Sequence, residues 1–269
     1  MQVMKSTDLQ IPVLAYHAVE NRPALDITTV TVIRFKQQLR NWHREGVQPI
    51  SLEEYLNREG QQKQGEKLLL LTFDDGYASL LENVLPLLEE RHYPAVLFPV
   101  TGYAGRDNDW DPARFRRHRC HLCLKQLDLI AGRGFAIGNH GFSHCDGSRL
   151  SDKLLVEEWR RAHQILVERG IVPVAAAWTF GRSTAVARDL LEASGYKIAF
   201  AMAAGNGWPW LIPRLACYRF SRFPLNYDRM QRIYSGKRRL QRMATFCNQL
   251  TGLFQRDCQK TLEEEETAD

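Results

Sequence analysis

The fold of this chain is decided by the stretch Leu68-Leu69-Leu70-Leu71-Thr72-Phe73-Asp74-Asp75-Gly76. Its apolar run has no polar alternation, which is typical of a strand buried on both faces of a parallel sheet flanked by helices. Two carboxylates end the run, and burying them side by side is costly unless a cation compensates. Because ligands bind at the carboxyl ends of parallel strands, the stretch predicts a metal site there. The alternative at this point is a turn that only caps the next helix.

A second polar cluster is Gly138-Asn139-His140-Gly141-Phe142-Ser143-His144, after the apolar residues 135–137. A lone histidine is more often a packing residue than a ligand, but two imidazoles four positions apart converge readily on one metal ion. The glycines and the asparagine favour a loop at a strand end. One Asp with two His gives a three-ligand site with open positions, as in catalytic rather than structural sites.

Together the two stretches resemble the polysaccharide deacetylases with NodB homology, carbohydrate esterase family four. The first family motif, Thr-Phe-Asp-Asp-Gly, is present at residues 72–76. The second, His-(Ser/Thr)-x-x-His, is matched by His140 and His144, with Gly141 in place of the hydroxyl residue. Residues 12–17 and 35–51 resemble the branch that includes biofilm-polysaccharide deacetylases, and the likeness covers about residues 11–225. It implies the α/β class and a distorted (β/α)7-type barrel, with the metal site at the C-terminal ends of parallel strands.

The resemblance also implies a chemistry: a metal-dependent hydrolase of cell-envelope carbohydrate that removes an N-acetyl group from an amino sugar. The sugar would belong to a glycan, a lipid-linked sugar or a polysaccharide or lipopolysaccharide precursor. The expected metal ligands are Asp75, His140 and His144. Zn²⁺ is the favoured ion, and N/O ligation also permits Co²⁺, Ni²⁺ or Fe²⁺. Asp74 is the expected general base, which takes a proton from water.

A third family motif, Pro-Tyr-Gly or Pro-Phe-Gly, corresponds to Thr179, Phe180 and Gly181, so that threonine replaces the proline. We expect the N–H of Phe180 to stabilise the oxyanion, since a main-chain donor does not depend on its side chain. Many family members protonate the leaving amine with a late histidine, but this chain has none after residue 163. The donor is then His17, Asp74 acting a second time, or a residue that the sequence does not identify. His17 is equally compatible with a packing role.

Two aromatic side chains in turn-rich segments are candidates for stacking on a sugar ring: Trp110 in segment 103–119, and Trp208 in segment 205–210. Trp110 could instead anchor its own loop, and the segment with Trp208 could instead contact an acyl chain. Between them, the run His118-Arg119-Cys120-His121-Leu122-Cys123 contains a single C-x-x-C, which is a weak zinc signal. The apolar spacing from residue 122 to 130 instead predicts a helix that carries this run.

The length of 269 residues predicts one catalytic domain over residues 1–235. Strand and helix patterns alternate along it, which favours parallel strands. Strands are predicted at 11–16, 68–75, 95–100, 172–180 and 197–202, and helices at 33–44, 51–58, 80–90, 151–170 and 185–195. Residues 236–260 predict a basic amphipathic helix, which either packs on the barrel or contacts an anionic membrane surface through residues 236–258. Residues 261–269 form an acidic tail, expected to be disordered.

The formal charge of +5 and the absence of aromatic nucleic-acid motifs argue against nucleic acid as a partner. No export signal or membrane-spanning run is visible, and six scattered cysteines fit reduced thiols, so the predicted location is cytoplasmic, peripheral to the inner membrane face. There the partner would be an N-acetylated precursor or lipid-linked glycan. The sequence does not indicate the oligomeric state.

A second function remains open: a catalytically impaired barrel that binds a glycan or a protein partner. Gly141, Thr179 and the missing late histidine favour it. The intact Asp-Asp and His/His set argues against it, since charged groups at a strand end are costly to keep. A phosphate-binding or dinucleotide enzyme is excluded because a glycine-rich phosphate loop is lacking.

Overall fold

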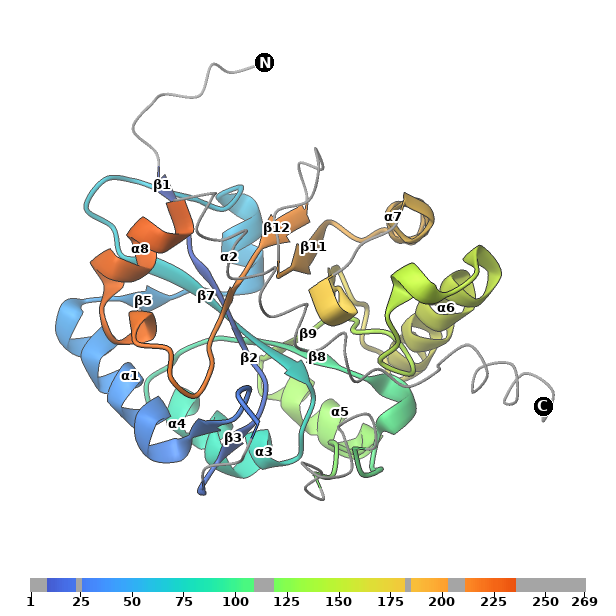
Figure 1. The fold of residues 1–269 in the computed structure, drawn as a ribbon, viewed down its shortest axis with the longest axis horizontal. Helices are drawn as coiled ribbons and strands as arrows, with labels where there is room; N and C mark the ends of the chain where they lie inside the picture. Colours follow the sequence, from blue (N-terminus) through green and yellow to red (C-terminus); the bar gives the residue numbers. More distant parts are fainter. Residues whose placement is uncertain (1–8, 23–25, 109–118, 182–184, 203–210, 236–269) are drawn as a thin grey trace, which may run out of the picture.

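The centre of the protein is a ring of parallel strands with helices around its outside, seen in a computed structural model that describes residues 9–22, 26–108, 119–181, 185–202 and 211–235 (Figure 1). Each hydrogen-bonded pair of neighbouring strands in the ring is parallel. In ring order the strands are β2 (Val13–Tyr16), β7 (Leu68–Asp75), β8 (Val96–Pro99), β9 (Ala136–Ile137), β10 (Ala175–Ala177), β11 (Ile198–Ala201), and β12 with β13 (Leu211–Pro213 and Leu215–Ala216).

Two irregular joints close this ring. Between β9 and β10, the backbone of Asn139 bonds to Ala175 (3.0 Å) and Ala177 (2.9 Å). Between β12 and β13 stands a single residue, Arg214, whose N–H donates to the carbonyl of Ala201 at 2.8 Å. At Arg214 the chain changes its partner from β11 to β2. Counting β12 and β13 as one strand, the described part of the chain forms a ring of seven strands, and the predicted distorted (β/α)7-type barrel is confirmed.

Strand β7 is the central element, as its sequence predicts. All eight of its residues are buried, between β2 on one side and β8 on the other. The short strand β5 (Gln48–Pro49) pairs with its beginning. Its last two residues, Asp74 and Asp75, pair with Phe98 and Pro99 of β8, which fixes them on the rim where the C-terminal ends of the strands meet.

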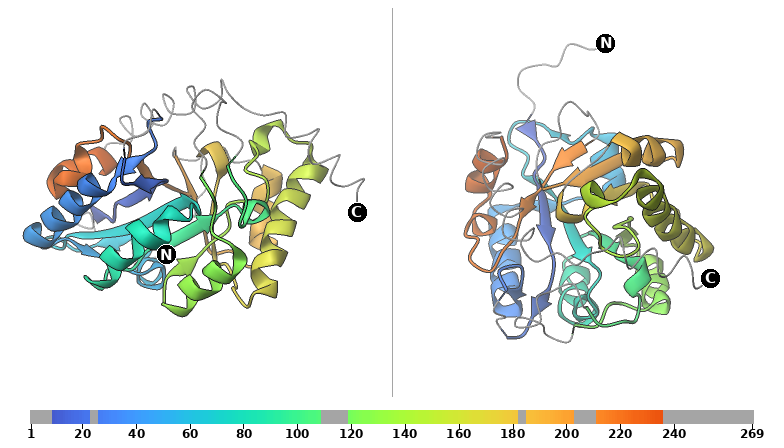
Figure 2. Two further views of the ribbon diagram at one scale, coloured as in Figure 1. Left: turned by 90° about the horizontal axis from the view of Figure 1, so that it is seen from below. Right: turned by 45° about the vertical axis from the view of Figure 1, so that its right-hand side comes forward.

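The helices on the outer side of the strands shield the core from solvent, as the two views in Figure 2 show. Helix α1 carries Trp42 into the core and ends at Gly46, whose φ of 69° needs glycine. Serines 51 and 151 cap α2 and α6 as predicted. The helices are α1 (Val32–Glu45), α2 (Leu52–Asn57), α3 (Ser79–Asn83), α4 (Leu85–Glu89), α5 (Leu124–Gly132), α6 (Asp152–Glu168), α7 (Ala185–Ala193) and α8 (Tyr227–Ser235).

Two helix predictions are wrong. The single helix over 80–90 is broken into α3 and α4 at Val84, because Pro86 has no N–H to continue the ladder. The helix near the C-x-x-C begins only at Leu124, with Cys123 as its cap residue. Cys120 and His121 precede it in extended bridges to Asp107 and Tyr77, so the helix does not carry them.

The cysteine prediction needs one correction. Cys120, Cys123 and Cys217 are free, but Cys145 is disulfide-bonded. Within the described ranges, no helix has the length and hydropathy needed to cross a membrane. The predicted basic helix at 236–260 and the tail at 261–269 lie outside the described residues.

Candidate metal centre

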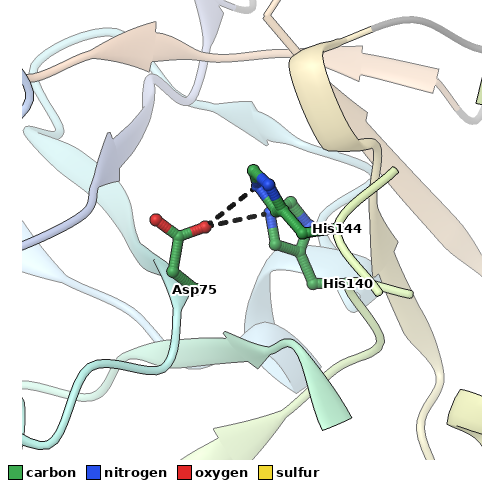
Figure 3. Close-up of side chains that lie close together, drawn as sticks. All are labelled: Asp75, His140 and His144. Atoms are coloured by element: carbon green, nitrogen blue, oxygen red, sulfur yellow. Dashed lines mark ion pairs between the residues drawn. The ribbon is translucent and has the colours of Figure 1, made fainter. Parts of the chain in front are cut away.

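Three side chains from two strand ends converge on one point (Figure 3). Asp75 is the last residue of β7, and His140 and His144 belong to the loop after β9. The Oδ1 atom of Asp75 lies 3.5 Å from Nε2 of His140 and 3.3 Å from Nε2 of His144. These ligand atoms all lie within 4.8 Å of one another. The structure therefore brings together the three residues expected to bind the metal.

The spacing of these atoms fits a tetrahedral metal site. Metal–ligand bonds of about 2.0–2.1 Å place neighbouring ligand atoms about 3.3 Å apart in a tetrahedron. His140 supports the same conclusion through its other nitrogen, which lies 2.7 Å from the carbonyl oxygen of Ala177. Since a carbonyl only accepts, Nδ1 carries the hydrogen, and in the neutral ring Nε2 turns a lone pair toward Asp75. In that form the two atoms are facing acceptors, and a metal ion between them would satisfy both.

Asp75 is an anion buried between these imidazoles. Burial raises its pKa, but His140 and His144 hold that pKa well below the ordinary value. Its Oδ1 accepts no hydrogen bond from the described residues, although it is shielded from solvent. A buried carboxylate oxygen without a donor is unfavourable, and a bound cation would compensate it.

Asp74, the other carboxylate of the pair, faces into the barrel and is held by Arg214. The guanidinium donates two parallel hydrogen bonds of 2.7 Å to its two oxygens, and a third of 3.0 Å to the hydroxyl of Thr72. Arg214 itself is buried against the rings of Phe98 and Phe200. Burial raises the pKa of Asp74, yet Arg214 and His140 bring it below its ordinary value. Asp74 is therefore ionised at neutral pH.

We expect Arg214→Lys to lower kcat/KM by about 10- to 100-fold, since an ammonium cannot form the paired hydrogen bonds. Arg214 lowers the pKa of Asp74, so a weaker partner lets that pKa rise. The acidic limb of the pH–rate profile should then move to higher pH. Acetate release across pH measures both effects, with Arg58→Lys at a surface ion pair as the control. An unchanged profile in Arg214→Lys would show that the arginine only fills space.

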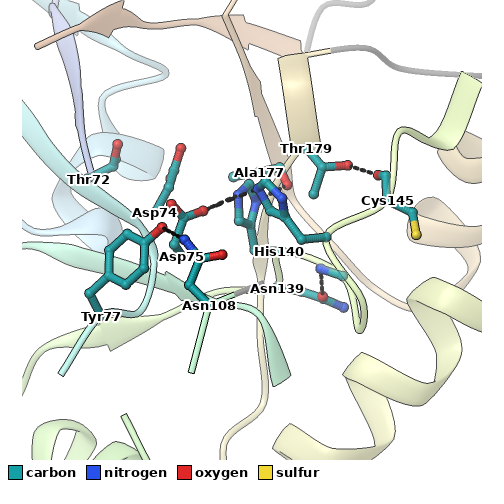
Figure 4. Close-up of polar contacts among 12 residues, drawn as sticks. Thr72, Asp74, Asp75, Tyr77, Asn108, Asn139, His140, Cys145, Ala177 and Thr179 are labelled. Carbon is teal, nitrogen blue, oxygen red and sulfur yellow. Dashed lines mark hydrogen bonds and ion pairs between the residues drawn. The ribbon is translucent and has the colours of Figure 1, made fainter. Parts of the chain in front are cut away.

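Side chains of the third motif, residues 179–181, contact the loop that carries His140 and His144, here called the metal loop (residues 138–145). The hydroxyl of Thr179 donates to the carbonyl oxygen of Cys145 (Figure 4). The ring of Phe180 lies 4.9 Å from that of His144, between centroids. The threonine that replaces the family's proline therefore binds the metal loop. Among the described residues, no hydrogen bond of the Phe180 N–H tests its predicted role, which stays a prediction.

The backbone is strained at this site. Asp75, Phe180 and His144 all have left-handed φ values, of 67°, 54° and 58°. For residues other than glycine, such conformations cost about 1–3 kcal/mol and persist only where the surrounding structure imposes them. Three strained residues around one point indicate that the site is held in place for a function.

Two further histidines lie near these groups. His17 follows β2 on the same rim, and its buried Nδ1 has no hydrogen-bond partner in the described part of the chain. Burial raises the pKa of Asp74 and Asp75, and His17 is among the groups whose charge lowers both.

The other histidine, His121, was missed as a site residue. It is buried, packs on Tyr77 and Tyr103, and donates from Nδ1 to the carbonyl oxygen of Arg106 at 2.9 Å. Burial lowers the pKa of His121 below its ordinary value, although the hydrogen bond to Arg106 and the charge of Asp75 oppose this. The hydroxyl of Tyr77 accepts from Asn108 at 3.1 Å (Figure 4).

The predicted sugar platforms Trp110 and Trp208 lie outside the described residues. Gly181 ends the short 3-10 turn from Thr179, directly after Phe180. The local sequence around Arg214 gives no sign that this residue belongs to the site. A buried arginine is rare, and the role of Arg214 becomes visible only when the fold brings it to Asp74, 140 positions away in the sequence.

A family model described as polysaccharide deacetylase matches residues 61–199, just over half of the chain. The poly-beta-1,6-N-acetyl-D-glucosamine N-deacetylase of Escherichia coli (strain K12) is 33% identical over 99 residues, which are 36% of this chain and 15% of that protein. YxkH of Bacillus subtilis (strain 168), named as a polysaccharide deacetylase, is 25% identical over 143 residues, 53% of this chain and 46% of that one. The chain therefore spans less than half the length of these relatives.

Solved structures show the same fold. IcaB from Ammonifex degensii superposes with a TM-score of 0.67 and 21% identity, over 84% of this chain and 96% of that one. A de-N-acetylase from Aggregatibacter actinomycetemcomitans gives a TM-score of 0.67 and 20% identity, over 82% and 99%. These matches extend the likeness from the family motifs to the barrel as a whole.

Proposed function

This chain belongs to the polysaccharide deacetylase family, and from that premise we propose that it hydrolyses the N-acetyl amide of an amino sugar. The observation that carries the proposal is the convergence of Asp75, His140 and His144 beside an ionised Asp74. A divalent ion, most favourably Zn²⁺, would be held by the three ligands and would supply Lewis-acid polarisation of the amide carbonyl and of water.

The protein's own groups then have separate tasks. Asp74, locked by Arg214, is oriented and ionised, so that it can take the proton of the attacking water. The N–H of Phe180 is proposed to stabilise the oxyanion. The imidazoles of the ligand set keep Asp75 charged. Its Oδ1 atom accepts no hydrogen bond from the described residues and is therefore available to the ion.

For the proton that the leaving amine needs, we propose His17. Its replacement with Ala should lower kcat for the N-acetyl sugar by about 100-fold, in line with the loss of a general acid. Hydrolysis of an activated aryl acetate, whose leaving group needs no proton, should persist. His43→Ala, on the exposed face of α1, is the control. An equal loss with both substrates would assign His17 to binding or folding instead.

The substrate class is tested by acetate release from a panel. It contains chitooligosaccharides, poly-N-acetylglucosamine, and nucleotide-linked and undecaprenyl-phosphate-linked N-acetylhexosamines, each with Zn²⁺-loaded protein and with Asp74→Asn. Release from one class that is lost in the variant supports the proposal. Silence across the panel from protein that binds one Zn²⁺ per chain would favour the glycan- or protein-binding alternative.

A cytoplasmic position, with peripheral membrane contact through 236–258, stays a prediction that cell fractionation tests. One observation favours an oxidising compartment instead, namely the disulfide bond at Cys145, because disulfides are rare in reducing cytoplasm.

A further inference from the structure

A carboxylate outside the ligand set accepts hydrogen bonds from the loop between the two histidines of that set. Glu158 lies on α6, and its Oε1 atom accepts from the backbone N–H groups of Phe142 (2.9 Å) and Ser143 (2.7 Å). Its Oε2 atom accepts from the hydroxyl of Ser143 at 2.7 Å. Both oxygens are thus used by residues that stand between His140 and His144.

The buried carboxylate of Glu158 in turn needs the hydrogen-bond donors of this loop. The residue is only 3% exposed, and among the described residues no cation pairs with it. Burial raises its pKa, and hydrogen bonds from Ser143, Phe142 and the backbone of Cys145 oppose that rise. A buried carboxylate without donors is strongly unfavourable. These loop donors are therefore what makes this position tolerable, and any movement of the loop leaves it unsatisfied.

Gly141 is what permits the close approach. Its φ is 82°, and a Cβ atom added there would lie 2.8 Å from Oε1 of Glu158. Its own N–H donates to the side-chain oxygen of Asn139 at 2.8 Å. A hydroxyl residue at this position would be strained at this φ, and its Cβ atom would displace the carboxylate from its present place. In the sequence, glycine in place of the hydroxyl residue favours an impaired enzyme. In the structure, Gly141 makes room for Glu158, which holds the loop instead.

His144 shows why the loop must be held. Its backbone has the left-handed φ of 58°, while its Nε2 atom lies 3.3 Å from Asp75. A strained residue keeps such a conformation only when neighbouring contacts impose it. Glu158 fixes the two residues directly before His144, and Thr179 binds the carbonyl of Cys145 directly after it.

We propose that Glu158 is a positioning residue of the metal centre. Its side chain is long enough to fix the backbone of Phe142 and Ser143, so that His140 and His144 present their Nε2 atoms to the ion. Gly141 leaves the space that the carboxylate occupies. The inference rests on the proposed metal binding by these histidines. It assigns to α6, a helix that supplies no ligand, a direct effect on metal affinity.

Two substitutions separate the reach of this side chain from its charge. Glu158→Gln keeps the length: its carbonyl can still accept from both N–H groups, and its NH₂ can donate to the Ser143 hydroxyl. Glu158→Asp keeps the charge, but its side chain is one methylene shorter, so the carboxylate no longer reaches the loop donors. We expect the Asp variant to bind Zn²⁺ roughly 10- to 100-fold more weakly, the range for loss of a group that orients metal ligands. The Gln variant should stay within a few-fold of wild type.

The measurement is Zn²⁺ affinity of the full chain by competition with a chromophoric chelator, with folding checked by circular dichroism and thermal melting. Glu157→Gln and Glu157→Asp are matched controls, because Glu157 is the preceding residue of α6 and pairs with Arg160 at the surface. Wild-type affinity in the folded Asp variant, or equal loss in the Gln variant, would overturn the inference. Absence of Zn²⁺ binding by the wild-type chain would instead overturn the proposed metal centre itself.

Discussion

Replacing Asp74 with Asn is expected to lower kcat for deacetylation by about 10²- to 10⁴-fold, the usual contribution of a general base. The carboxylate is buried, oriented by two hydrogen bonds from Arg214 and kept ionised by that contact. An amide of the same shape cannot take a proton. Because both oxygens of Asp74 bond to Arg214 and Asp74 is not one of the three ligands, Zn²⁺ affinity should change little. Acetate release and chelator competition on the same preparation measure the two effects.

The matched control for this substitution is Asp128→Asn. Asp128 is also paired with an arginine, Arg169, but on the protein surface. It should keep wild-type turnover. Full activity in Asp74→Asn would remove Asp74 from the chemistry, whereas a parallel loss of Zn²⁺ affinity would show that its charge serves the ion instead.

Replacing Asp75 with Asn should abolish activity through the metal. Its Oδ1 atom is the one oxygen in the ligand set, and it lies within 3.5 Å of both imidazole Nε2 atoms. An amide oxygen carries no charge, so we expect Zn²⁺ to bind roughly 100-fold more weakly or worse, at least the loss seen for groups that only orient ligands. Chelator competition measures it directly.

The same variant should respond to added metal. If the loss arises from affinity, millimolar Zn²⁺ should restore part of the turnover in Asp75→Asn, and it should restore none in Asp74→Asn. Wild-type affinity in Asp75→Asn would mean that the ion, if it binds, is held elsewhere.

The sequence predicted the centre of the fold well, because the signals there are local. The apolar run of β7 and the turn residues around His140 fix a strand end and a loop within a few positions each. One Asp of the pair could be placed with His140 and His144 because parallel strands place their C-terminal ends on one rim, and the family resemblance indicated that this ligand is Asp75.

Features that depend on distant contacts were not predicted. Arg214 stands between two strands of two or three residues each, too short to give a periodic signal. Its partner Asp74 is far away in sequence, and an isolated arginine is ordinarily expected to lie on the protein surface. His121 was assigned to a helix because the apolar spacing that begins at Leu122 predicted a helix carrying the residues just before it, whereas an extended bridge to Tyr77 determines the conformation of His121.

Glu158 left a signal that could have been used. It stands three and four positions after Leu155 and Leu154 and four before Ala162, all on the buried face of α6. A carboxylate at a buried position of an amphipathic helix requires donors from elsewhere. The sequence does not say which loop supplies them, since that depends on how α6 packs beside the loop after β9.

The central claim is that Asp75, His140 and His144 bind a metal ion on which deacetylation depends. Its most direct test is acetate release by metal-free protein during titration with Zn²⁺, using the substrate found in the panel. We predict no release before metal is added, a rise to a plateau at one ion per chain, and no rise for His140→Ala over the same range. Full release by metal-free protein, or wild-type titration by His140→Ala, would contradict the account.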